Sequence, residues 1–346
     1  MAALLLGCST AQLETTPPAT STTASLQREV ADTTTSLARP TTTTTPSLVD
    51  QLRGTRIDPI PSLLDGRPAT FLGVTRDHAA VEVGTQNGEM VRPIAQIATA
   101  ADVANAECAA CVNAVDQVWR LADGSAFLVS ECCEPASGHM FWLLQDAEPV
   151  TPEKGEPDRG GLQAWAAAPA PGAPFVAGSS YYLTIASPED PLIWIASEDF
   201  LASGPPAWSW DLARLYVFED DVLPDNDGMT LRTIDIEANT SDPFALAWWP
   251  PESYSSGLAM SAEGNLITFV LTRDDDNFEN DPATGVVFKP DGQRIRDFPV
   301  EAGSTLGGFD PTGTFLIYVD GEGVVRWHDT WARLGVLGHG FYTASW

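Results

Sequence analysis

Apolar residues in this chain come in short runs that are bounded by turns. One stretch shows the pattern clearly: a turn at Gly308–Gly313 precedes the mostly apolar run Thr314–Val319, and a second turn at Asp320–Gly323 precedes the run Val324–Trp327. Because β-branched and aromatic residues dominate these runs and glycines flank them, they favour strands over short helices. A run that is apolar at nearly every position predicts a strand buried on both faces.

The same order of turn and strand recurs along the chain. Copies lie at Pro206–Phe218 and Leu258–Val270, a looser copy at Val118–Ser130, and a degenerate one at Ala168–Gly178. Units of strand and turn that recur about every 40–50 residues predict a β-propeller, in which each unit is one four-stranded blade. A β-sandwich or another all-β architecture is the alternative, although a sandwich completes its pattern in about 100 residues.

Three copies share a more detailed pattern, in which an aromatic residue or methionine begins a polar turn and an apolar strand follows. This pattern resembles the WD40-like repeat of TolB-type propellers, and the resemblance covers about residues 60–346. It implies a propeller of four-stranded blades, six favoured over seven. Leu212 replaces the turn glycine in one copy, and Thr312 replaces the aspartate in another. The matching segments are Trp208–Asp211 with Leu215–Phe218, Met260–Gly264 with Ile267–Val270, and Phe309–Gly313 with Leu316–Val319.

Two local expectations complete the fold prediction. The segment Gly338–Trp346 ends in a way similar to how other copies begin, so we expect it to pair with a strand around Thr70–Val74 and join the two ends of the propeller. Residues Ile94–Ala106 are the place where one short helix fits the pattern.

The N-terminal residues differ from the rest of the chain. Leu5–Cys8 is similar to a bacterial lipobox, so we expect residues 1–8 to be the remnant of a lipoprotein signal peptide and Cys8 to be acylated. The basic segment of such a signal is missing, which suggests that translation begins further upstream. Residues 9–55 are rich in Thr and Pro and predict a disordered tether. The propeller domain is expected over residues 56–346, outside the cytoplasm and held to a bacterial cell membrane by the lipid.

The chain is strongly acidic, with 47 Asp and Glu against 18 Lys and Arg and a net charge of −29. A charge of this sign repels nucleic acid and anionic membrane surfaces, so neither is expected as a partner. The sequence has no apolar run long enough to span a membrane as a helix, so the lipid is the expected membrane attachment. We expect a monomer.

Four further cysteines, Cys108, Cys111, Cys132 and Cys133, flank one predicted hairpin. In an exported protein this arrangement predicts disulfides. Because neighbouring residues of a strand point to opposite faces, Cys132 and Cys133 are expected to take different partners. A zinc site and a Cys-x-x-Cys redox motif are the alternatives; the adjacent second pair disfavours zinc, and the missing βαβ context disfavours the redox motif.

Two acidic segments are candidates for calcium. One contains Asp274, Asp276 and Asp281, and the other contains Asp225 and Asp227. Carboxylates at alternate positions suit hard cations. In so acidic a chain, solvated turns are the alternative. No other cofactor is expected.

The sequence holds four histidines and neither a G-x-S-x-G nor an H-E-x-x-H motif. Trp248 and Trp249 precede two prolines and predict an exposed loop that contributes to a binding surface. The leading hypothesis is therefore a protein- or glycan-binding module rather than an enzyme. The alternatives are a glycan-directed hydrolase that uses a carboxylate pair and a structural component of the cell envelope. Two carboxylates about 5–10 Å apart in a pocket beside exposed aromatic residues would favour the hydrolase.

Overall fold

The computed structural model describes part of the chain in detail. The described residues are 63–64, 66–106, 114–120, 126–132, 138–143, 149–150, 162–167, 175–179, 182–186, 193–195, 204–220, 228–238, 240–273, 278–329 and 333–346. All of them belong to the compact unit Thr45–Trp346.

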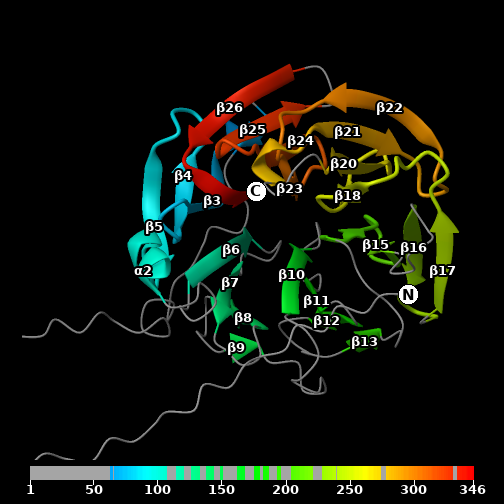
Figure 1. The fold of residues 1–346 in the computed structure, drawn as a ribbon, viewed down its shortest axis with the longest axis horizontal. Coiled ribbons are helices and arrows are strands. Elements are labelled where there is room, and N and C mark those ends of the chain that lie inside the picture. Colours follow the sequence, from blue (N-terminus) through cyan, green and yellow to red (C-terminus); the bar gives the residue numbers. More distant parts are fainter. Residues whose placement is uncertain are drawn as a thin grey trace, which may run out of the picture. The chain divides into compact units, whose positions relative to one another are not determined.

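The described strands form a series of four- and five-stranded antiparallel sheets, which we number in chain order (Figure 1). This series of antiparallel sheets confirms the predicted β-propeller fold. Sheet 1 contains β27 (Phe341–Ser345), β3 (Thr70–Thr75), β4 (Ala79–Gly84) and β5 (Met90–Gln96); sheet 2 contains β6 (Ala114–Arg120), β7 (Ala126–Cys132), β8 (Gly138–Leu143) and β9 (Pro149–Val150); sheet 3 contains β10 (Leu162–Ala167), β11 (Phe175–Ser179), β12 (Tyr182–Ala186) and β13 (Ile193–Ile195).

The later sheets follow the same plan, with each strand hydrogen-bonded to the next along the chain. In sheet 5 the first strand is split into β18 and β19, which both pair with β20. Sheet 4 contains β14 (Ala207–Trp208), β15 (Arg214–Asp220), β16 (Met229–Asp235) and β17 (Thr240–Ala245); sheet 5 contains β18 (Ser253–Ser255), β19 (Ala259–Met260), β20 (Leu266–Thr272), β21 (Ala283–Phe288) and β22 (Arg294–Pro299); sheet 6 contains β23 (Thr305–Phe309), β24 (Phe315–Val319), β25 (Val324–Asp329) and β26 (Arg333–His339).

Sheet 1 takes its first strand from the C-terminal end of the chain. Strand β27 pairs antiparallel with β3, and the register places Ser345 opposite Leu72 and Ala344 opposite Gly73. This pairing is the one expected from the sequence. Figure 1 shows the C-terminal strand, in red, beside the blue strands of sheet 1.

The remaining described elements are short. Strands β1 (Leu63–Leu64) and β2 (Arg67–Pro68) form a two-stranded ribbon, and a 3₁₀ turn, η2, spans Phe278–Asn280. Helix α2 (Ala100–Asn105) lies inside the segment where a short helix was predicted. Thr99 caps it, because its hydroxyl accepts from the amide of Asp102 at 3.2 Å while the Asp102 carboxylate accepts from the Thr99 amide at 2.8 Å.

Strand β24 shows how the apolar runs fill the core. Phe315, Ile317 and Val319 belong to a cluster shared with sheet 1, whereas Leu316 and Tyr318 belong to a cluster shared with sheet 5. All five side chains are buried. Because alternate residues point to opposite faces, the strand fills two boundaries between sheets at once, which is why its sequence is apolar at every position.

The repeated turns are equivalent in the structure. Leu212, Gly264 and Gly313 have left-handed φ angles of 58°, 77° and 67°. In each turn the amide of this residue donates to the carbonyl three positions earlier. The conformation favours glycine, so Leu212 occupies the glycine position of the repeat at a cost in backbone strain.

The substitution of Thr312 for aspartate is compensated by an exchange of roles. In one turn the hydroxyl of Ser209 donates to the carboxylate of Asp211 at 2.6 Å. In the other, the carboxylate is at Asp310 and accepts from the Thr312 hydroxyl at 2.6 Å. The Asp310 carboxylate also accepts two amides further along the turn, at 2.9 and 2.8 Å, and it is fully buried. Both turns therefore keep a hydroxyl–carboxylate pair two residues apart.

Candidate functional site

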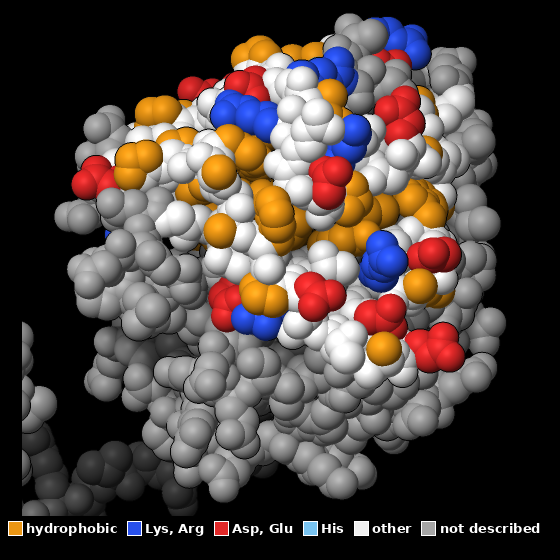
Figure 2. Space-filling view, turned by 90° about the vertical axis from the view of Figure 1, so that its right-hand side faces the viewer, with side chains coloured by type: hydrophobic (Ala, Val, Ile, Leu, Met, Phe, Trp, Pro, Cys, Tyr) orange, Lys and Arg blue, Asp and Glu red, His pale blue; other side chains and the backbone are white. Residues whose placement is uncertain are grey.

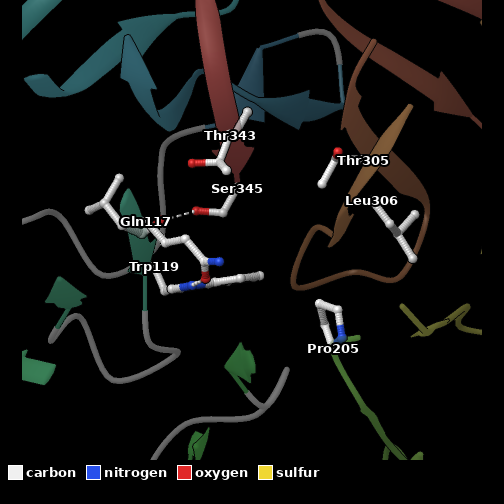
Figure 3. Close-up of a pocket in the computed structure, with 9 residues that line it drawn as sticks. Gln117, Trp119, Pro205, Thr305, Leu306, Thr343 and Ser345 are labelled. Carbon is white, nitrogen blue, oxygen red and sulfur yellow. Dashed lines mark hydrogen bonds between the residues drawn. The ribbon is translucent and has the colours of Figure 1, made fainter. Parts of the chain in front are cut away.

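A small pocket, the inner pocket, lies where first strands of several sheets meet (Figure 3). Strand β27 contacts both β6 and β23 there. The cavity itself is small, about 40 Å³, and it is partly open to solvent. Nine residues line it: Gln117, Val118 and Trp119 from β6, Pro205 ahead of β14, Thr305 and Leu306 from β23, and Thr343, Ala344 and Ser345 from β27.

Trp119 and Gln117 are two positions apart on β6, and both side chains reach this pocket. The indole Nε1 of Trp119 donates to the Gln117 Oε1 at 3.0 Å. Across the pocket, the Ser345 hydroxyl donates to the Val118 carbonyl at 2.8 Å, which ties the first strand of sheet 1 to that of sheet 2 (Figure 3). These bonds fix the wall of the pocket.

None of the nine lining residues carries a charge. The lining of the pocket is thus uncharged, although the whole chain has a net charge of −29. The carboxylate pair that the hydrolase hypothesis requires is not among these nine side chains.

A second candidate lies on the outside, over the boundary of sheets 4 and 5. Phe244 of β17 is 49% exposed, and its ring lies so close to Gly292 that a Cβ added there would be 2.2 Å from the Phe244 Cε1. Trp248 is half-buried and donates its Nε1 hydrogen to the Gly292 carbonyl at 2.8 Å. The guanidinium carbon of Arg294 lies 5.3 Å from the centre of a Trp248 ring. We call Phe244, Trp248, Gly292 and Arg294 the aromatic surface.

Figure 2 faces the side of the molecule where β17 and β22 lie in Figure 1. It shows hydrophobic side chains gathered in a hollow, with Lys or Arg and Asp or Glu side chains on both sides of it. Exposed residues next to the aromatic surface in the chain include Asp242, Lys289 and Asp291. Exposed side chains of both signs thus lie close in the chain to the residues of the aromatic surface.

The loop expected to expose two tryptophans exposes only one of them. Trp249 is 7% exposed and packs into the core, where its ring centre lies 5.2 Å from that of Phe218. This corrects the prediction for Trp249, since a binding contact needs an accessible side chain. Trp248 remains partly exposed. Phe244, which the sequence analysis did not name as a binding residue, is exposed on β17.

A buried ion pair links sheets 1 and 2. Glu82 of β4 and Arg120 of β6 are 5% and 6% exposed, and the Arg120 Nη2 lies 3.2 Å from the Glu82 Oε1. The same carboxylate accepts from the Thr70 hydroxyl and the Arg92 Nε, each at 2.8 Å. Burial raises the pKa of the Glu82 carboxyl, but the bonds from Thr70 and Arg92 and the charge of Arg120 outweigh it, so the pKa lies below its ordinary value.

Two tyrosines, the buried Tyr318 and the partly buried Tyr254, pair with carboxylates. The Tyr318 hydroxyl donates to the Glu301 Oε2 at 3.1 Å, and the Tyr254 hydroxyl donates to the Asp281 Oδ2 at 2.7 Å. Burial, followed by the neighbouring carboxylate, raises the pKa of both phenols. They remain neutral donors at physiological pH and serve as crosslinks.

Of the five predicted calcium ligands, Asp281 is the one that lies among the described residues. Asp281 is 2% exposed and accepts the Tyr254 hydrogen bond. No group of three or more His, Cys, Asp and Glu side chains suited to a metal occurs among the residues that the structure describes. The other predicted calcium ligands, Asp274, Asp276, Asp225 and Asp227, lie outside those residues.

The remaining predicted sites also lie outside the described residues. These are the lipid site Cys8, the tether at residues 9–55, and Cys108, Cys111 and Cys133. Cys132 is the last residue of β7, and its side chain is not described. The disulfide and lipidation hypotheses therefore stay predictions.

Solved structures to which this chain is similar include TolB from Acinetobacter baumannii and a dipeptidyl peptidase 4 from Porphyromonas gingivalis. The first is 12% identical, with a TM-score of 0.49, and the match covers 80% of this chain and 65% of TolB. The second is 11% identical, with a TM-score of 0.37, and the match covers 84% of this chain and 54% of the peptidase. This chain therefore spans less than two thirds of either protein. No protein-family model matches the sequence, and neither does any curated protein.

Proposed function

We propose that this protein is an extracytoplasmic binding module, held to a membrane through Cys8 and a flexible tether, which binds a protein partner at its aromatic surface. The observation that carries the proposal is that the exposed Phe244 and the half-buried Trp248 both contact Gly292, with Arg294 over the indole. Exposed apolar groups that cluster on a soluble domain typically mark an interaction site.

The composition of the aromatic surface fits the centre of a protein interface. Tryptophan and arginine are the residues that most often dominate binding energy, and they do so when a partner shields them from water. Phe244 leaves 49% of its surface for a partner to cover. Asp242, Lys289 and Asp291, which are exposed and close in the chain to this surface, would form the polar rim of such an interface.

The position of the surface also limits how a partner binds. Strands β17 and β22 are the last strands of their sheets. β17 contains Pro243, which lacks a backbone N–H, and β22 carries Arg294, Arg296 and Asp297. Proline and charge on an outer strand discourage the addition of another strand. We therefore expect side-chain packing rather than strand pairing.

The net charge indicates the class of partner. Because the chain has a net charge of −29, its electrostatic field attracts a cationic protein and repels an acidic one. The partner is therefore expected to carry net positive charge. Association should slow as salt is added, because salt screens this attraction.

Membrane attachment through lipid rests on the sequence. Within the residues described by the structure, no helix is long and apolar enough to cross a membrane. The lipobox-like Leu5–Cys8 and the Thr- and Pro-rich residues 9–55 support an anchor and a tether. Intact mass of protein extracted from membranes tests this: an acylated Cys8 is expected, and an unmodified soluble protein would refute it.

The binding proposal is tested by capture from a solubilised envelope fraction of the source organism. Immobilised wild-type protein is compared with Phe244→Ser, Trp248→Ala and the control Met90→Ser. Met90 is 60% exposed on β5, the last strand of sheet 1. We expect one or more cationic proteins that the two surface variants lose by at least tenfold and the control retains. Identical capture by wild type and both surface variants would refute the proposal.

A further inference from the structure

Strand β26 (Arg333–His339) forms the outer edge of sheet 6. It pairs with β25, and among the described strands no other is hydrogen-bonded to it. Figure 1 shows β26, in red, on the outer side of β25. The outer edge of a sheet presents backbone N–H and C=O groups that can pair with a strand of another chain.

The other outer strands carry residues that discourage such pairing, and the centre of β26 does not. Proline inside an outer strand removes a donor, and charged residues oppose the approach of a second strand. The one Lys, Arg, Asp or Glu residue of β26 is Arg333 at its first position, where the Arg333 Nε lies 2.6 Å from the Asp329 Oδ2. Outer strands with described side chains carry such residues at inner positions: Arg92 and Pro93 on β5, Asp242 and Pro243 on β17, and Arg296 and Asp297 on β22.

The backbone groups of Leu334 and Val336 point away from β25. Arg333 lies opposite Asp329 of β25, and its amide donates to the Asp329 carboxylate at 2.8 Å, so the Arg333 amide faces β25. Successive residues of an antiparallel strand direct their backbone groups to alternate sides. Those of Gly335 therefore face β25 as well, whereas those of Leu334 and Val336 face outward, where they can pair with another strand.

Leu334 and Val336 also expose apolar side chains. They are 51% and 49% exposed, and because they are two positions apart they project from one face of the strand. On the opposite face Trp327 lies against Gly335, where an added Cβ would be 2.2 Å from the Trp327 Nε1. No residue of β26 is acidic, although the whole chain has a net charge of −29. The centre of β26 is thus an uncharged, apolar edge on a molecule that otherwise repels its own copies.

The centre of β26 is complementary to itself. A two-fold axis at Gly335 would place Leu334 of one copy opposite Val336 of the other in an antiparallel pair. Because the backbone groups of both residues face outward, the two residues would exchange N–H···O=C bonds, and the same exchange would recur on the other side of the axis. Directly opposite residues lie on the same face of a sheet, so the four apolar side chains would form one cluster. A second copy therefore satisfies both the backbone and the side chains of this edge.

We propose that two copies of this chain associate through antiparallel pairing of their β26 strands about Gly335, which joins the two copies of sheet 6 into one continuous sheet. This dimer departs from the monomer expected from the sequence. A symmetric contact of this kind closes after two copies and leaves no further β26 edge open. Because the contact rests on one pair of short strands, it is expected to be weak compared with interfaces that bury about 1,200–2,000 Å².

Salt is expected to strengthen the dimer. Two molecules that each have a net charge of −29 repel each other, and salt screens this repulsion. Binding of a cationic partner at the aromatic surface should respond in the opposite direction. The proposed contact includes no residue of the aromatic surface, so either proposal can fail while the other stands.

The test is sedimentation velocity of the full-length protein over a range of concentrations, at low and at high salt. Wild type is expected to shift from monomer to dimer as the concentration rises, and to do so more completely at high salt. Val336→Lys places a charge at the centre of the contact and should raise the dissociation constant at least tenfold. Phe244→Lys is the matched control, since Phe244 is also 49% exposed on an outer strand, β17, and it should dimerise like wild type.

Leu334→Pro tests the backbone of the contact separately. Proline there removes an outward N–H group that β26 does not use to pair with β25, so the fold should be retained while the dimer weakens. Hydrogen exchange of wild type needs no variant: the amides of Leu334 and Val336 should exchange more slowly as the concentration rises, and those of β17 should not change. A monomer at every concentration and salt, a dimer that both variants leave unchanged, or exchange at Leu334 and Val336 that does not depend on concentration would each overturn the proposal.

Discussion

Two boundaries between neighbouring sheets use different interactions. Between sheets 1 and 2, the apolar cluster is supplemented by the buried pair Glu82–Arg120. Between sheets 4 and 5, the boundary is aromatic: the ring centre of Phe218 lies 5.2 Å from that of Trp249 and 6.3 Å from that of Phe288.

The boundary between sheets 1 and 2 offers few free groups to a ligand, whereas the boundary between sheets 4 and 5 continues to the molecular surface. The Glu82 carboxylate is saturated by donors from its own and the adjacent sheet, so it offers little to a ligand. The aromatic boundary extends outward from Trp249 to Trp248, whose ring centres are 5.6 Å apart, and the exposed Phe244 lies against Gly292, to which Trp248 donates a hydrogen bond. A rigid aromatic base beneath exposed aromatic residues is the arrangement that binding surfaces need.

The largest effect is expected at the ion pair. Removing one partner of a buried pair leaves a buried charge uncompensated, so Arg120→Ala should lower the free energy of unfolding by about 3–5 kcal/mol. Urea denaturation measures it. Arg92→Ala is the matched control, because Arg92 bonds the same carboxylate but is 37% exposed, and its loss should cost about 1 kcal/mol or less. Equal losses of unfolding free energy in the two variants would show that the burial of Arg120 does not make its ion pair more important for stability than that of the exposed Arg92.

The next effect distinguishes the two adjacent tryptophans. Trp249→Ala empties a buried site and should cost about 3 kcal/mol in unfolding free energy. Trp248→Ala should cost clearly less, since its ring is half-buried. Urea denaturation of both variants tests the order. A greater loss at Trp248 would assign it to the core and weaken its role as a contact for a partner.

Acid should act mainly on the ion-pair boundary. The pKa of Glu82 is lower in the folded state than its ordinary value of 4.5, so its stabilising contribution is present above that ordinary value and is lost as the pH falls through the lower folded-state pKa. Glu82→Gln removes this titration. At pH 7 it should cost about 1–3 kcal/mol, and the gap to wild type should shrink toward pH 3. Denaturation curves across this range check it, and a gap that stays constant would contradict the assignment.

The smallest stability effect concerns a turn on the aromatic side. Leu212 has a φ of 58°, a conformation that costs a non-glycine residue about 1 kcal/mol. Leu212→Gly relieves this strain but loosens the unfolded chain, so we expect a gain of up to about 1 kcal/mol in unfolding free energy. The matched change Gly264→Ala, at the same position of another repeat, should destabilise. Thermal unfolding of the pair tests the equivalence of the turns, which a loss at Leu212→Gly would contradict.

Local patterns in the sequence predicted the fold where they depend on nearby residues. The apolar run of β24, the turns around Leu212 and Gly313, and the helix at Ala100–Asn105 all follow from short segments. The pairing of the C-terminal strand with β3 followed from the repeat, because an incomplete unit at each end predicts that the ends pair.

The sites depend on residues that are far apart in the chain, and there the sequence was less informative. Trp248 bonds to a residue 44 positions away, and Glu82 pairs with Arg120 38 positions away. Nothing in the neighbourhood of Trp119 marks it as a pocket residue. Its position two residues after Gln117 on the first strand of a repeat is the one signal that, with the propeller fold in hand, places both side chains on one face.

The most direct test of the account is photo-cross-linking at the aromatic surface. A photoreactive phenylalanine analogue is placed at position 244 in full-length protein, expressed in the source organism, and the same analogue at position 90 serves as control. Position 244 is expected to give a discrete adduct with a cationic protein that position 90 does not give, and Trp248→Ala should reduce its yield. The absence of an adduct from position 244, or equal adducts from both positions, would contradict the claim that this surface binds a specific partner.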